Sequence, residues 1–151
     1  MDFPGIPITT NKELFEKTSR IGKQLIELHL LSSPLIETSR TGFPEVGTGM
    51  IERVRYDPDK SRVMINEKQW FSNIPAHVWK YDVGGYQICE RWLLERLARK
   101  LNSYDQMTYM ELVSVIKETI GLQQQMDSLY SEIESENLEL RREKEQRTLP
   151  K

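Results

Sequence analysis

The spacing of apolar residues is helical in the first part of the chain. From Leu14 to Leu28, apolar side chains recur at intervals that place them on one side of a helix. Thr10 and Glu13 stand three residues apart, which is the spacing of a capping box. The pattern therefore predicts a helix that begins near Thr10 and ends at the Ser-Ser-Pro sequence of residues 32–34. The following residues 35–48 lack a clear period and are predicted to form a loop.

The period changes to that of β-structure after residue 49. Two short runs, residues 50–56 and 62–66, are rich in residues that favour strands. Between them lies the sequence Asp-Pro-Asp-Lys-Ser, in which proline presets a turn dihedral and aspartate side chains bond the local backbone. This arrangement predicts an antiparallel hairpin over residues 50–66.

Helical spacing returns in the second half of the chain. Gly84 and Gly85 favour a tight turn, and an amphipathic helix is predicted over residues 86–101. Ser103 is a favourable N-cap for a last helix over residues 105–146, whose second half is highly charged. The predicted fold class is α+β: a small antiparallel sheet packed by several helices, with a long C-terminal helix. The predicted domains are an α+β unit at 1–127 and a charged helical tail at 128–151.

Aromatic residues are concentrated between residues 49 and 100, which hold all three tryptophans and three of the six tyrosines. Exposed aromatic rings can stack on nucleic-acid bases. Aromatic rings beside apolar residues are also what a small sheet needs in order to pack against helices. The second interpretation is favoured for most of them.

Composition narrows the function classes. The net charge of −2 is not typical of a nucleic-acid binder. Residues 1–100 hold 15 basic and 13 acidic side chains, whereas residues 101–151 hold 6 and 10, so the first part could present a local basic surface while the tail is acidic. Cys89 is the single cysteine, so no internal disulfide can form, and a cytoplasmic location is expected. No apolar run is long enough to cross a membrane, and no membrane partner is expected.

The predicted hairpin carries the candidate binding residues. Arg53 and Arg55 alternate with Val54 and Tyr56, so one side of that strand is cationic and the other apolar. Cations could neutralise phosphates, and arginine or glutamine could read base edges. The competing interpretation makes them solvated partners of nearby acidic side chains. The candidates for DNA contact are Arg53, Arg55, Lys60, Arg62, Lys68 and Gln69.

No set of residues indicates catalysis. His29 and His77 stand apart from each other and from other metal-ligating residue types. Cys89 lies among apolar residues, which favours a buried thiol without an activating partner. Gly84 and Gly85 lack the spacing of a phosphate-binding loop. Neither a metal nor a cofactor is therefore expected, and whether the chain is part of an enzyme is left open by the residues alone.

Several short motifs in a fixed order resemble one family. YDPDKSRVMIN, QWF, IP-x-x-VW and GGYQ-x-CE-x-WL are similar to the C-terminal specificity domain of type ISP restriction-modification enzymes. The resemblance extends over residues 2–127. Before the hairpin it includes DFPGIPIT, ELF and ELHLL, and after it SYDQM and IKETIGL. Enzymes of this family combine nuclease, ATP-driven translocase, adenine-N6 methyltransferase and DNA-specificity parts in one polypeptide.

The resemblance implies a role in DNA-sequence recognition. Its implied partners are double-stranded DNA and the methyltransferase and translocase parts of the same system. The glycine-rich cofactor loop and the Asn/Asp-Pro-Pro-Tyr/Phe motif of the methyltransferase are absent from this sequence, so catalysis would come from other parts. The alternative function is a protein-interaction or scaffold module that self-associates through residues 105–146.

Overall fold

The chain folds into two compact units. The computed structural model describes residues 9–30, 42–43 and 46–148, with side chains up to residue 144. Unit 1 comprises Met1–Glu27 and Gly121–Lys151, and unit 2 comprises Leu28–Ile120. Helix α4 (Ser103–Thr148) contributes to both units. The predicted helix stop at residues 32–34 and most of the predicted loop at 35–48 lie outside the described residues.

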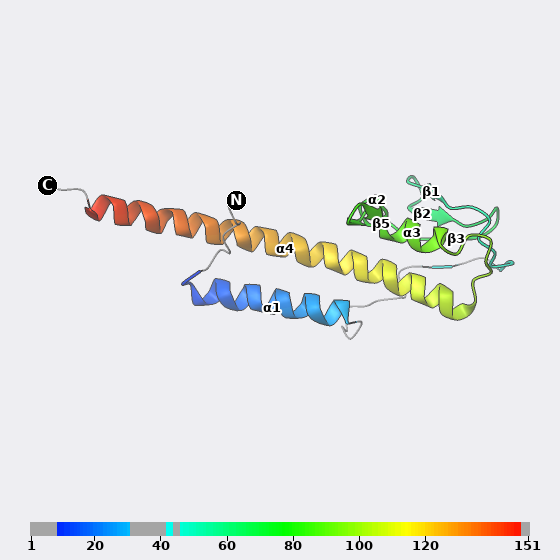
Figure 1. Cartoon of the computed structure of the whole chain (residues 1–151), viewed down its shortest axis with the longest axis horizontal. Helices are drawn as coiled ribbons and strands as arrows, with labels where there is room; N and C mark the ends of the chain where they lie inside the picture. The colour runs from blue at the N-terminus through cyan, green and yellow to red at the C-terminus, as the bar shows by residue number, and fades with distance from the viewer. Residues whose placement is uncertain (1–8, 31–41, 44–45, 149–151) are drawn as a thin grey trace. The chain divides into compact units, whose positions relative to one another are not determined.

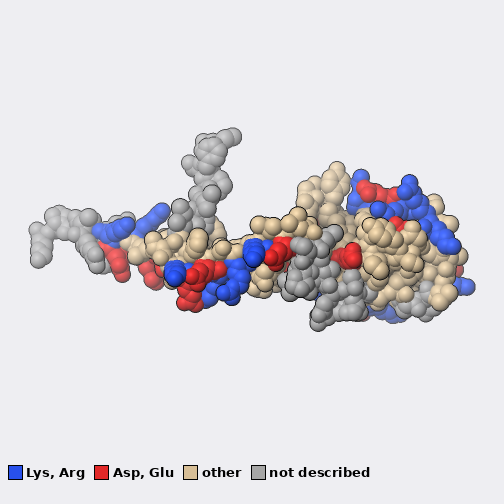
Figure 2. Space-filling view, turned by 90° about the horizontal axis from the view of Figure 1, so that it is seen from below, with Lys and Arg blue, Asp and Glu red and all other residues tan. Residues whose placement is uncertain are grey.

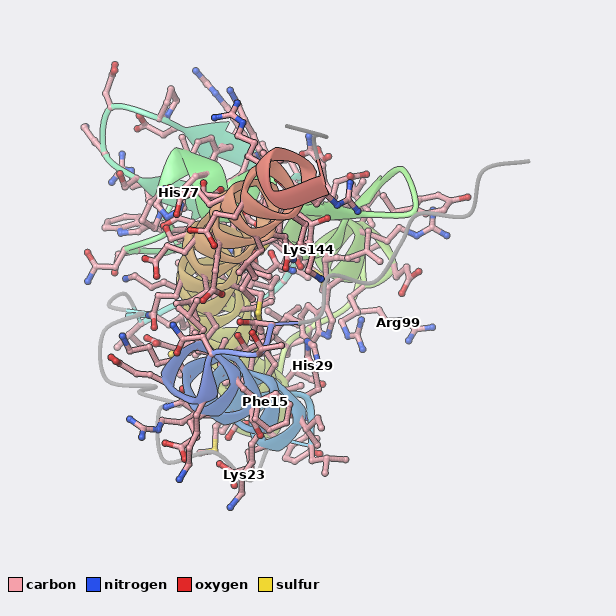
Figure 3. All side chains as sticks on the ribbon, turned by 90° about the vertical axis from the view of Figure 1, so that its left-hand side faces the viewer. Phe15, Lys23, His29, His77, Arg99 and Lys144 are labelled. Atoms are coloured by element: carbon pink, nitrogen blue, oxygen red, sulfur yellow. The ribbon has the colours of Figure 1, made fainter. Side chains whose placement is uncertain are left out.

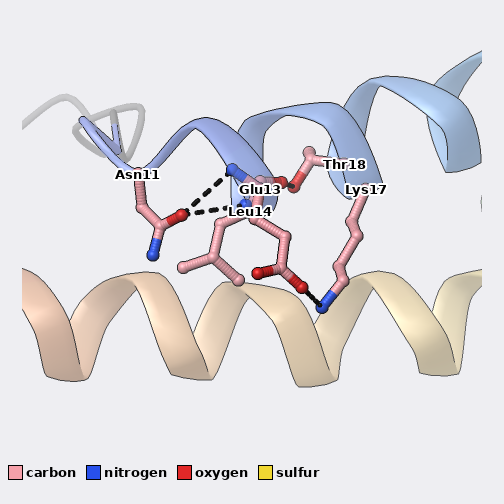
Figure 4. Close-up of polar contacts among 5 residues, drawn as sticks. All are labelled: Asn11, Glu13, Leu14, Lys17 and Thr18. Atoms are coloured by element: carbon pink, nitrogen blue, oxygen red, sulfur yellow. Dashed lines mark hydrogen bonds and ion pairs between the residues drawn. The ribbon is translucent and has the colours of Figure 1, made fainter.

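Unit 1 contains most of helix α1 (Lys12–His29), which a side-chain cap begins. Asn11 Oδ1 accepts hydrogen bonds from the amides of Glu13 (3.0 Å) and Leu14 (3.4 Å), as Figure 4 shows. The amide of Asn11 in turn donates to Thr9 Oγ1 at 3.0 Å. The capping residue is therefore Asn11 and not Thr10, because an asparagine side chain reaches the same orphan amides one residue later.

Within unit 1, α1 runs alongside the second half of α4 in the opposite direction (Figure 1). The Thr9 hydroxyl donates to Glu136 Oε2 at 2.8 Å, whereas Ile21 shares a surface hollow with Leu129. The helices bury apolar side chains at roughly heptad spacing, which is how two helices keep one stripe in contact. These residues are Leu14 and Ile21 on α1 and Leu122, Leu129 and Ile133 on α4.

Unit 2 contains a three-stranded antiparallel sheet in the order β1-β2-β3. The strands are β1 (Arg55–Asp57), β2 (Arg62–Met64) and β3 (Trp70–Phe71). The predicted hairpin is confirmed, but its regular part is shorter than residues 50–66. The amides of Glu52 and Arg53 both donate to Ile65 O, so a bulge interrupts the ladder there.

The second predicted helix is wrong in its extent. Residues 86–101 form strand β5 (Tyr86–Gln87), the short helix α3 (Ile88–Leu94) and then turns. Ala98 adopts a φ of 61°, and its amide donates to Ile51 O at 2.8 Å. The chain leaves the helical path because residues 98–101 pair with residues 49–51. The helical spacing of residues 86–101 could not predict this pairing with residues 49–51.

Gly84 and Gly85 form the two-residue turn of a second hairpin. Both have positive φ, 62° and 85°, and they join β4 (Asp82–Val83) to β5. Positive φ at both central positions matches the twist of a tight hairpin and favours glycine. The predicted tight turn is confirmed, although a strand precedes the helix.

One apolar core holds unit 2 together. The sheet, α2 (Ala76–Trp79), α3 and the first part of α4 all contribute buried side chains to it. Tyr109 is fully buried, with its ring centroid 4.5 Å from that of Phe71 and 5.1 Å from that of Trp92. The packing interpretation is therefore confirmed for Phe71 and Trp79, whereas Tyr86 is exposed.

Helix α4 begins at a reciprocal cap. Asn102 Oδ1 accepts from the amide of Asp105 at 2.8 Å, and Asp105 Oδ2 accepts from the amide of Asn102 at 3.0 Å. Asn102 therefore caps the helix in place of the predicted Ser103. The long C-terminal helix and the α+β class are confirmed. The domain boundary predicted at residue 127 stays a prediction. Among the described residues, no helix has the length and apolar character to span a membrane.

Candidate nucleic-acid interface

The three-stranded sheet has one buried and one outward face. Tyr56, Val63 and Phe71 lie opposite one another in the register and point into the core. Side chains alternate along a strand, so their neighbours face the other way. The outward face therefore carries a cross-strand row of Arg55, Met64 and Trp70, with Asp57 and Arg62 beside it. The exposed Arg53 stands two residues before β1, at the bulge, and is counted with this face. This set is called the outer sheet face below.

Arg62 is held in place on the outer sheet face. Its Nε lies 3.3 Å from Asp57 Oδ2, and its guanidinium carbon lies 4.6 Å from the centre of the Trp70 ring. Both charged side chains are largely covered, at 19% and 25% exposed. An arginine that stacks on an aromatic ring while paired with a carboxylate has a fixed orientation. Asp57 thus neutralises one of the candidate cations and orients it.

Four other candidate cations differ from Arg62. Arg53, Arg55, Lys60 and Lys68 are exposed, and no ion pair joins any of them to another described residue. Among the described residues, an ion pair with a carboxylate is therefore present for Arg62 and for none of these four, whose roles stay predictions. Figure 2 shows Lys and Arg atoms gathered at its right-hand end, with fewer Asp and Glu atoms among them.

The turn between β1 and β2 fixes where Lys60 lies. Asp57 Oδ1 accepts a hydrogen bond from the Lys60 amide at 3.3 Å, and the Ser61 amide donates to Pro58 O. Ser61 has a φ of 47°, which closes the turn in the left-handed region. The Asp-Pro-Asp sequence thus forms the predicted turn and presents the Lys60 ammonium at the end of the hairpin.

Gln69 is placed differently from the other candidates. Its side chain is 2% exposed, and its Oε1 accepts from the Gly49 amide at 2.7 Å and from Asn66 Nδ2 at 2.9 Å. Asn66 Oδ1 accepts from the amides of Lys68 and Gln69. This buried network joins the segment before β1 to the loop after β2. We therefore leave Gln69 out of the proposed DNA-contacting set.

Replacing Gln69 with leucine is expected to lower the free energy of unfolding by about 1–3 kcal/mol. The substitution leaves the Gly49 amide without its buried acceptor and removes one of the two acceptors of Asn66 Nδ2, which keeps Met50 O. Urea unfolding followed by tryptophan fluorescence measures the change. Lys68→Leu is the matched control, because its exposed side chain should leave stability nearly unchanged. An equal loss in both variants would contradict the structural role of Gln69.

Met64 is a surface residue that sequence reasoning missed, whereas Trp70 was considered only as one of the aromatic residues that could stack on bases or pack in the core. Their place on the outer sheet face follows from the register, in which Met64 pairs with both Arg55 and Trp70. The strand signal at residues 70–71 is only two residues long, so the third strand was not expected. The two adjacent aromatic residues were the only sequence feature at this position that favours a strand.

A second group of arginines lies on and after α3. The Arg96 guanidinium lies 3.7 Å from the Trp92 ring centre, and its Nη1 donates to Trp92 O at 3.0 Å. Arg91 pairs with Glu95 at 2.8 Å and lies over the Tyr86 ring. These contacts satisfy carbonyl and carboxylate groups at the end of the helix, as expected from the helix dipole.

The described residues hold no arrangement that indicates catalysis. Among them, no group of three or more His, Cys, Asp or Glu residues is suited to hold a metal ion. His77 and Arg99, which Figure 3 labels, belong to separate segments of unit 2. Cys89 is fully buried, and this burial raises the pKa of its thiol to about 12. A thiol in this environment stays protonated at neutral pH and is a poor nucleophile.

The comparison with known families agrees with the motif order. The model of the type ISP C-terminal specificity domain matches residues 1–131. No curated protein and no solved structure matches the chain. The matched region includes all of unit 2, with the outer sheet face, and α1 of unit 1. The chain therefore belongs to the type ISP C-terminal specificity domain family, whose role is recognition of the DNA target in restriction-modification systems.

Proposed function

We propose that the domain contacts duplex DNA through the outer sheet face and the adjoining hairpin turn. The observation that carries this proposal is the group of four exposed cations without ion-pair partners among the described residues, next to the half-buried Trp70. Free cations can replace the counterions of phosphates at little cost, whereas a paired cation must first lose its carboxylate. Arg53, Arg55, Lys60 and Lys68 are the proposed phosphate contacts.

Arg62 has a different proposed role. The carboxylate of Asp57 and the ring of Trp70 fix its guanidinium, which reduces the entropy lost when it binds a base edge or a phosphate. Trp70 and Met64 supply apolar surface beside it, which suits contact with sugar or a thymine methyl group. The outer sheet face thus combines charge for affinity with a fixed side chain for positioning.

The domain itself performs no chemistry in this proposal. It holds the target duplex so that the methyltransferase of the same system can reach its adenine, and the translocase acts on the same DNA. The self-association that the sequence predicts through residues 105–146, and the scaffold function based on it, stay predictions.

A salt titration of DNA binding tests the proposal. The full chain is mixed with a pool of random-sequence duplex DNA, and the affinity is measured by fluorescence anisotropy at increasing KCl. Four phosphate contacts predict that log K falls against log salt with a slope of about −3 to −4. Undetectable binding at low salt, or binding that is insensitive to salt, would overturn the proposal. Tight binding to one selected sequence would add direct readout by Arg62 to the phosphate contacts.

A further inference from the structure

Helix α1 carries two exposed large apolar residues on a second line, at an angle to its buried stripe. Phe15 is 64% exposed and Ile26 is 62% exposed, although both are large apolar side chains in an 18-residue helix. At about 100° per residue, they lie roughly a third of a turn from Leu14 and Ile21, which unit 1 buries. Figure 3 labels Phe15 on this helix. Single exposed apolar residues are common on protein surfaces, so the residues between these two decide whether the line is suited to a partner.

Small residues lie between the two apolar ones. Ser19 and Gly22 occupy the same line, and a Cβ atom added to Gly22 would meet no atom within 4 Å. The stripe Phe15, Ser19, Gly22 and Ile26 has the alternating spacing of four, three and four residues found in helix–helix seams. The midpoint between residues 15 and 26 is also the midpoint between residues 19 and 22. A second copy running antiparallel would therefore set Phe15 against Ile26 and Ser19 against Gly22.

The charges along one flank of the stripe repeat this symmetry. Lys12, Glu16, Lys23 and Glu27 follow one another on that flank as plus, minus, plus, minus. Lys12 pairs with Glu16, and Lys23 pairs with Glu27, each at 3.8 Å within the helix. In an antiparallel copy these four charges run in the reverse order, minus, plus, minus, plus. Each charge on this flank therefore lies opposite one of the other sign. A parallel copy in register would instead place like charges together, which is unfavourable.

From this arrangement we propose that α1 is an isologous docking surface for a second copy of this chain, in antiparallel orientation. The two-fold axis passes between Ser19 and Gly22, where small side chains allow close approach of the helices. Phe15 and Ile26 supply the apolar contact at both ends. The flank pairs Glu16 with Lys23 of the other copy and Lys12 with its Glu27. This surface is separate from the outer sheet face, so dimer formation and DNA binding can be tested independently.

Sedimentation equilibrium of the full chain over a wide concentration range is the first test. A reversible dimer is expected, and Phe15→Ser combined with Ile26→Ser is expected to raise its Kd by at least about 100-fold. Both side chains are already exposed, so the variant should keep the circular dichroism of the parent chain. A monomer at every concentration, or a dimer that the double substitution leaves unchanged, would overturn the proposal.

Charge exchange tests the antiparallel orientation. Glu16→Lys and Lys23→Glu are each expected to weaken the dimer, because each creates two like-charge contacts across the axis. The double variant Glu16→Lys/Lys23→Glu is expected to restore it, even though its pairs within the helix become repulsive. Glu13→Lys is the matched control, since it breaks the 2.7 Å pair with Lys17 on the opposite side of the helix. Failure of the double variant to restore the dimer would rule out this geometry.

Disulfide trapping gives an independent readout of orientation. Glu16→Cys mixed with Lys23→Cys is expected to form a covalent heterodimer under mild oxidation, whereas neither variant should cross-link to itself. Native Cys89 is fully buried and should not interfere. Self-linking of Glu16→Cys would indicate a parallel arrangement and contradict the proposal.

Discussion

Charge reversal of Arg53 and Arg55 to glutamate is expected to weaken binding of duplex DNA by at least about 100-fold at moderate salt. Each substitution removes one phosphate contact and adds a repulsive carboxylate on the outer sheet face. The slope of log K against log salt should become less steep by about two units. Fluorescence anisotropy with the same DNA pool measures both quantities. Because both side chains are exposed, the stability of the domain should change little.

A matched pair of substitutions separates site-specific contact from total charge. Lys80→Glu combined with Arg99→Glu changes the net charge equally, at two exposed positions outside the outer sheet face. This control should weaken binding only modestly through long-range repulsion. An equal loss of affinity in both double variants would mean that the outer sheet face is not the binding surface.

The second large effect is expected at Tyr109. Replacement with alanine should lower the free energy of unfolding by about 3–5 kcal/mol, because it empties a fully buried aromatic site in unit 2. Tyr109→Phe keeps the ring contacts with Phe71 and Trp92 and loses only the hydroxyl hydrogen bond to Cys89 O, 3.3 Å long. Its expected cost is about 1 kcal/mol. Urea unfolding monitored by circular dichroism measures both values.

Alkaline pH gives a further readout of the same residue. Burial raises the pKa of the Tyr109 hydroxyl well above its ordinary value of 10.0. The unfolded chain therefore releases this proton at lower pH than the folded chain, so stability should fall as the pH rises above about 10. Tyr109→Phe should make that fall less steep. Equal steepness in the two proteins would contradict full burial of the hydroxyl.

The helix starts were predicted to within a few residues, but the capping residues were not. The sequence placed helix starts near residues 10 and 103, and the structure begins helices at Lys12 and Ser103. In both cases the capping side chain is an asparagine, Asn11 or Asn102, next to the expected Thr or Ser. Several residue types can accept hydrogen bonds from the unpaired amides of the first helical turn. The sequence therefore locates a helix start to within a residue or two, but it does not identify the capping residue.

Part of the candidate site could also be predicted from local spacing. Alternation along the first strand put Arg53 and Arg55 on one side, and both are exposed. Gln69 was grouped with them because glutamine can read base edges, yet the side chain is buried and bonds to Gly49 and Asn66. A buried polar side chain and a solvent-exposed one have the same sequence signal until the partners are known.

The buried stripe of α1, the hairpin turn, the long C-terminal helix and the family could all be predicted from the order of residues. These features depend on residues a few positions apart, or on an ordered set of short motifs. Contacts between distant segments, in contrast, end the helix after Leu94 and place Trp70 on the same sheet face as Arg55. The fold also pairs Arg62 with Asp57, whereas no ion pair joins its cationic neighbours to another described residue. Such outcomes depend on hydrogen bonds and register between distant segments, which local spacing cannot encode.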